Sequence, residues 1–95
     1  MTTLDLSKYG TILTGRSFGK QTMEELSPTL DYPVELDFRG VTSLGSSFGD
    51  EVIPGIARQQ NGQLTAIGPN KAVWDCLLQI AEEHNIQILK KDQID

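Results

Sequence analysis

Runs in which apolar and polar residues alternate occur at four places along the chain. Alternation with a period of two is typical of a β-strand that buries one face. The clearest run is VELDF, in which Glu35 and Asp37 separate three apolar side chains. Together the runs predict four strands, at residues 4–6, 34–38, 64–67 and 86–89.

Between the predicted strands, apolar residues recur at the spacing of helices. The order β-α-β-α-β-α-β favours an α/β fold with a largely parallel sheet. Pro28 ends the first helix, and Asn70 and Asn85 are suitable residues for the start and the end of the third. The stripes are Phe18, Thr22, Met23 and Leu26; then Phe48, Val52, Ile56 and Ala57; then Val73, Leu77, Ile80 and Ala81.

Pro54 interrupts the second helical stretch. A proline in a helix interior removes a backbone hydrogen bond and costs about 3 kcal/mol. The stretch is compatible with a short helix that ends near Val52, with a kink, or with a second helix that starts at Pro54. We favour a kink or a restart.

The polar positions of the strands indicate how the layers are arranged. A sheet covered on both faces has strands that are apolar throughout. Here Asp5, Glu35, Asp37 and Gln87 occupy alternate positions, so one face is expected to be wet and all three helices to share the other. Since about 98% of parallel crossovers are right-handed, helices on one side give the sequential strand order 1-2-3-4. The direction of the first strand and the conformation of residues 8–15 stay open.

Composition limits both the architecture and the classes of function. Ninety-five residues suffice for one domain, residues 1–95, in two layers. With 13 acidic and 8 scattered basic side chains the net charge is −5, which argues against nucleic-acid binding. No stretch is apolar enough for a membrane span. The lone Cys76 excludes an internal disulfide and favours a cytoplasmic setting.

The remaining polar residues offer no recognisable active site. Asp5, Glu35 and Asp37 are read as a solvated acidic face without a metal, although Asp37 is also suited to ordering the loop that follows its strand. His84, the only histidine, suits the negative end of the third helix. We find no paired carboxylates, metal-ligand spacing or nucleophile–base pair, so we expect neither an enzyme nor a cofactor.

Two segments thirty residues apart resemble each other: GRSFGK at 15–20 and GSSFGD at 45–50. Each precedes or opens a helix and offers a serine near the N-cap, so two capped helices are one complete explanation. A functional interpretation starts from the second copy. A phosphate on a serine at a helix start adds about −1.5 to −2 charges where the helix dipole tolerates them. Such a modification would change the surface while leaving the fold intact.

The stretch VELDFRGVTSLGSSFGD resembles the signature of STAS domains, the fold of anti-sigma factor antagonists. Their pattern is a strand that ends in aspartate and a hydrophobe, a loop with valine, and Asp-Ser-Ser/Thr-Gly at a helix start. Val41 and the serine pair match this pattern, whereas Gly45 replaces the aspartate and Phe48 the glycine. This form, with Arg16 in an earlier helix, is more similar to the small bacterial STAS-like domains of undefined function. The resemblance runs from about residue 4 to residue 89.

The resemblance implies a mixed sheet with helices, a GHKL-type ATPase or kinase as protein partner, and control by serine phosphorylation. Carried over residue by residue, Ser46 and Ser47 are the candidate phosphoacceptors. We therefore expect a regulatory, protein-binding module. The oligomeric state stays open.

Residues around the two helix starts complete the candidate site. We assign partner or anion binding to Arg16, Ser17, Phe48 and Asp50. Arg16 is either a solvated side chain or one that lies near the serine pair. Lys20 and Asp50 are expected to pair across the two starts. An alternative function is a sensor of an anionic small molecule or nucleotide, held by backbone N–H groups at the helix starts and by Arg16.

Overall fold

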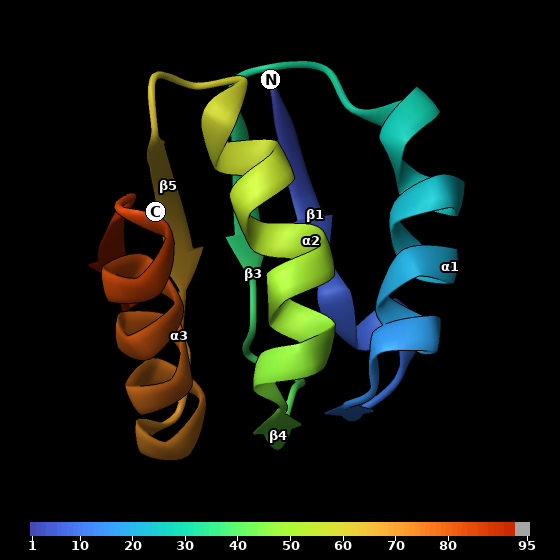
Figure 1. The fold of residues 1–95 in the computed structure, drawn as a ribbon, viewed down its shortest axis with the longest axis vertical. Helices are drawn as coiled ribbons and strands as arrows, with labels where there is room; N and C mark the ends of the chain where they lie inside the picture. The colour runs from blue at the N-terminus through green and yellow to red at the C-terminus, as the bar shows by residue number, and fades with distance from the viewer. Residues whose placement is uncertain (93–95) are drawn as a thin grey trace.

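The computed structural model describes residues 1–92 and contains a four-stranded, fully parallel sheet. The strand order β1-β3-β5-β6 is the sequential order predicted from the polar pattern, and β1 runs parallel to β3. Figure 1 shows the three helices side by side over one face of this sheet. The strands are β1 (Thr2–Asp5), β3 (Val34–Asp37), β5 (Gln63–Ile67) and β6 (Gln87–Lys91), and the helices α1 (Arg16–Leu26), α2 (Ser46–Arg58) and α3 (Lys71–His84).

The central helix α2 packs against α1 on one flank and α3 on the other (Figure 1). Its apolar stripe and the inward side chains of the strands form one core, in which Leu36, Phe38, Phe48 and Ile56 are at most 1% exposed. The predicted two-layer α/β architecture is therefore confirmed. No helix within residues 1–92 is long and apolar enough to cross a membrane.

The other face of the sheet is open, as predicted, but it is less acidic than expected. Thr3 and Leu89 are exposed on it, and Glu35 is partly exposed. Asp37, expected on the wet face, is only 7% exposed because Arg39 folds over it. Its carboxylate also accepts the backbone N–H of Arg39 at 2.9 Å, so the loop-ordering role is confirmed.

The segment left open at residues 8–15 contributes to a second, small sheet. A 3-10 turn at Leu6–Tyr9 is followed by β2 (Ile12–Leu13), which pairs in parallel with β4 (Ser43–Leu44). Because α1 follows β2 and α2 follows β4, this pairing brings the two helix starts to the same edge of the molecule. Neither β2 nor β4 has an apolar–polar alternation long enough to predict a strand.

Helix α2 continues through Pro54 from Ser46 to Arg58, so of the two outcomes that we favoured, a kink or a restart, the restart is wrong. Pro54 is buried, and the packing of α2 between its neighbours outweighs the missing backbone hydrogen bond. The ends of α3 agree with prediction. Asn70 caps its start by accepting the Val73 N–H at 2.8 Å, and Asn85 ends it in a left-handed conformation.

Candidate functional site

The two helix starts of the repeated segment lie next to each other and have glycine, not serine, as N-caps. Gly15 precedes α1 and Gly45 precedes α2, and neither start has a side-chain cap. The N–H of Gly45 donates to the carbonyl of Leu13 at 2.8 Å, which ties the start of α2 to β2. The serine caps expected from the sequence are therefore wrong, and the serines occupy the first turns of the helices.

The phenylalanine and glycine of each repeat have a packing role. The rings of Phe18 and Phe48 contact each other with centroids 5.2 Å apart. A Cβ added to Gly19 would lie 2.9 Å from the carbonyl oxygen of Phe48, and one added to Gly49 would overlap Ile80. Gly19 thus lets α1 approach α2, and Gly49 lets α2 approach α3. Phe48 is 1% exposed, so this assigned contact residue belongs to the core instead.

The hydroxyl-bearing candidates remain at the surface. Ser46 and Ser17 are exposed, and Ser47 is partly exposed. Ser46 and Ser47 are the first and second residues of α2, where the backbone N–H groups have no carbonyl one turn earlier to donate to. This end of the helix carries the positive end of the dipole, which favours a negative group on either serine.

Arg16 reaches α2, but its partner is a carboxylate rather than the serine pair. Its Nη1 donates to Oε2 of Glu51 at 2.8 Å, and the two side chains are 53% and 22% exposed. Glu51 lies one helical turn after Ser47, so the guanidinium is held near the start of α2. Glu51 was absent from the predicted site, because sequence alone does not say which side of α2 faces α1.

Asp50 points to the opposite flank of α2, so the expected Lys20–Asp50 pair does not form. Consecutive residues of a helix are about 100° apart, and Asp50 therefore faces α3 whereas Glu51 faces α1. Oδ1 of Asp50 lies 3.0 Å from Nε2 of His84, at the end of α3. Lys20 instead lines a shallow hollow on α1 and α2 with Met23, Glu24, Ser27 and Glu51.

Another charged pair missed by the sequence lies at the carboxyl end of β3. The Arg39 guanidinium donates to both carboxylate oxygens of Asp37, with its shortest contact at 2.7 Å. This hydrogen bonding lowers the pKa of Asp37, and the partial burial of the carboxyl opposes the shift. The pair orders the first residues of the loop from β3 to β4.

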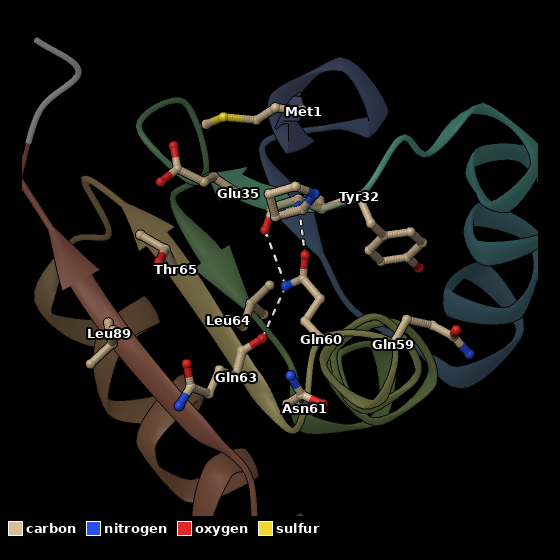
Figure 2. A pocket seen from close by; sticks show the side chains of 12 residues that line it. Met1, Tyr32, Glu35, Gln59, Gln60, Asn61, Gln63, Leu64, Thr65 and Leu89 are labelled. Atoms are coloured by element: carbon tan, nitrogen blue, oxygen red, sulfur yellow. Dashed lines mark hydrogen bonds between the residues drawn. The ribbon is translucent and has the colours of Figure 1, made fainter.

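A hollow of about 490 Å³ lies at the opposite end of the sheet, where β3 and β5 begin (Figure 2). The Gln60 amide in this hollow is hydrogen-bonded to the backbone of the fold. It donates to the carbonyls of Val34 and Gln63 at 3.3 and 2.9 Å and accepts the Val34 N–H. Tyr32 and Leu89 contribute exposed apolar surface to its lining. The hollow and the repeated segment are therefore separate features.

Comparison with known protein families gives one match. Residues 19–74, more than half of the chain, match a family described as a STAS-like domain of unknown function. The matched region includes the serine pair, Glu51 and all of α2. Comparisons with curated proteins and with solved structures find no significant match.

Proposed function

Because the chain belongs to the STAS-like domain family of unknown function, we propose that it is a regulatory module that binds a protein partner. The binding surface is the area around the start of α2, with Arg16, Ser17 and the serine pair. Phosphorylation of Ser46 or Ser47 switches the binding, as in anti-sigma factor antagonists. The role is one of binding rather than catalysis, in the cytoplasm.

The observation that carries the proposal is the position of the serine pair. The serines lie at the surface at the start of α2, which has no side-chain cap and is next to the start of α1. Ser46 is exposed and its helix has no side-chain cap, so a phosphate there displaces no hydrogen bond of the fold. A phosphate would face two helix starts, whose dipoles favour negative charge. The modification thus alters the charge of the surface and leaves the core untouched.

The glycine at position 45, where the STAS pattern has aspartate, has a local steric explanation. A Cβ at Gly45 would lie 3.1 Å from Cγ2 of Thr14, on the strand side of the junction. An aspartate there would press against the β2–α1 connection. The close pairing of β2 and β4 therefore accounts for a glycine at this position, while the serine pair is kept.

The partner class follows from the resemblance to STAS domains: a GHKL-type ATPase or kinase. A pull-down with the purified chain, analysed by mass spectrometry, identifies a bound protein and a phosphoserine in one experiment. We expect Ser46→Asp or Ser47→Asp to weaken partner binding and leave the circular dichroism spectrum unchanged. Gln87→Glu adds one negative charge at the far edge of the sheet and serves as the matched control. Unchanged binding of both aspartate variants contradicts the switch.

A sensor of a phosphate compound or nucleotide is the second candidate, favoured by the adjacent glycine-capped helix starts. Backbone N–H groups at such starts bind anions, and Arg16 supplies a cation at the same edge. We expect some phosphate-bearing ligand to raise the melting temperature, and Arg16→Ala to abolish the shift. Arg58→Ala removes another exposed arginine, at the far end of α2, and is the control. A flat response across the ligand panel argues against this function.

A further inference from the structure

Three potential metal ligands meet where the second turn of α2 packs against the last turn of α3. They are Asp50 from α2 and the neighbours Glu83 and His84 from α3, and one donor atom of each lies within 4.8 Å of the others. The closest two, Oδ1 of Asp50 and Nε2 of His84, are 3.0 Å apart. Donor atoms on one zinc ion lie about 3–3.5 Å apart, because each bond is about 2 Å long. Rotation of the exposed Glu83 side chain closes the remaining gap.

The chemistry of the three donors suits a divalent transition metal. An imidazole nitrogen with carboxylate oxygens is a donor set for Zn²⁺, Co²⁺ or Mn²⁺, whereas Mg²⁺ and Ca²⁺ prefer oxygen alone. Two carboxylates and a neutral imidazole balance the charge of such an ion. Three protein ligands leave a fourth position for water or for a ligand group, as in open zinc sites.

Helix packing brings the three donor side chains near one another before any ion binds. Gly49, next to Asp50, allows α2 to lie directly against Ile80, one turn before the end of α3. The Gln79 amide donates to Oε1 of Glu83 at 3.2 Å and orients that carboxylate, as groups behind metal ligands commonly do. The side chains of Asp50 and His84 are 23% and 27% exposed, so an ion can reach them from solvent.

The electrostatic environment agrees with this geometry. Within residues 1–92, no lysine or arginine forms an ion pair with Asp50 or Glu83, and His84 is the only basic partner of Asp50. On the same face of α3, burial raises the pKa of the Cys76 thiol, and the charges of Asp50 and Glu83 raise it further. The space around these side chains, between α2 and α3, therefore has a negative potential that a cation would neutralise.

We propose that Asp50, Glu83 and His84 form a binding site for one divalent transition-metal ion that bridges α2 and α3. The site is separate from the serine pair and does not depend on the proposed partner binding. Because its ligands come from two helices, the ion cross-links the end of α3 to the start of α2.

The test is calorimetric titration of the chelator-treated full chain with Zn²⁺, supported by Co²⁺ absorption spectra. We expect one ion per chain with micromolar or tighter affinity, and a rise in melting temperature with Zn²⁺. His84→Gln and Asp50→Asn are each expected to weaken binding by at least about tenfold, the loss that even an outer partner of a metal ligand causes. Glu82→Gln, which removes the same charge from the adjacent exposed position, is expected to bind as the native chain does.

Cys76→Ser separates the proposed site from simple thiol capture of the metal. Binding is expected to persist in this variant, and the Co²⁺ spectrum of the native chain to lack a thiolate charge-transfer band. Circular dichroism of each variant before metal addition verifies that it is folded. The proposal is overturned by absence of saturable binding to the native chain, or by loss of binding in Cys76→Ser. It is overturned equally if His84→Gln weakens binding but Asp50→Asn does not, since that describes a lone imidazole.

Discussion

Three glycines inside α1 and α2 provide a graded test of how closely the helices pack. A Cβ on Gly19 would meet the backbone of Phe48, with the carbonyl oxygen at 2.9 Å and Cα at 3.1 Å. A Cβ on Gly49 would meet only the Ile80 side chain and would overlap its terminal Cδ1. A Cβ on Gly55 would touch Cε of Met23 at 3.4 Å, an ordinary contact. Backbone atoms cannot move aside as the end of a side chain can. Alanine should therefore change the free energy of unfolding by a different amount at each of the three sites.

Each alanine substitution raises the helix propensity, and it destabilises the fold wherever the added Cβ overlaps a neighbouring atom. Alanine in place of glycine stabilises a helix interior by about 0.5–1 kcal/mol. Overpacking of a filled interior costs about 1–3 kcal/mol. We therefore expect Gly55→Ala to raise the free energy of unfolding by about 0.5–1 kcal/mol, and Gly19→Ala to lower it by about 1–2 kcal/mol. Gly49→Ala should fall between them, because Ile80 is buried but its end can rotate.

Urea denaturation followed by circular dichroism measures these differences, with thermal melting as a second readout. In a domain of this size, 1 kcal/mol corresponds to about 4–8 °C in melting temperature. The slope of the urea transition is expected to be unchanged, since the folded surface stays the same. If Gly19→Ala is as stable as the native chain, or less destabilised than Gly49→Ala, the close approach of α1 to the Phe48 backbone is refuted.

Other predictions concern polar contacts that hold the strands and helices. Asp37→Asn should remove an acid-labile part of the stability. Because the pKa of Asp37 is lowered in the folded chain, its contribution is present above the unfolded pKa of about 3.9 and is lost as pH falls through the folded value. Acid titration of unfolding, compared between the two proteins, measures this. Gln60→Leu leaves the Val34 N–H without its partner and should lower the free energy of unfolding, measured by urea denaturation, by about 1–3 kcal/mol. Asn70→Ala removes the cap of α3 and should lower the free energy of unfolding by about 0.5–2 kcal/mol in the same urea assay. Arg16→Ala should lower it by at most about 1 kcal/mol, because the ion pair of Arg16 is exposed.

The main sheet was predictable because its signals are local. Alternation around Glu35 and the one wet face were enough to give the strand order and the single helical layer. The small sheet was not, since β2 and β4 have two residues each and are defined only by pairing with each other. The strength of α2 was also underestimated: Pro54 counts against a helix locally, but burial between two helices overrides that preference.

The candidate site was predictable in its position but not in its contacts. The repeat correctly located two helix starts, and the serine pair lies at the surface as the site requires. The partners of Arg16 and Asp50 were missed for a single reason. They depend on which flank of α2 each residue occupies, and a shift of one residue along a helix turns a side chain by about 100°.

The central place of α2 links these observations. Its second turn presents Glu51 to Arg16 on one flank and Asp50 to His84 on the other, with the serine pair one turn before both. A phosphate on the serine turn would add charge beside two carboxylates, so it would compete with Glu51 for Arg16 and repel the Asp50 carboxylate on the other flank. Gly19 and Gly49 keep α1 and α3 close to α2, so the added charge would affect the contacts on both flanks. A chemical change at one exposed turn would therefore alter the contacts of the central helix with both of its neighbours.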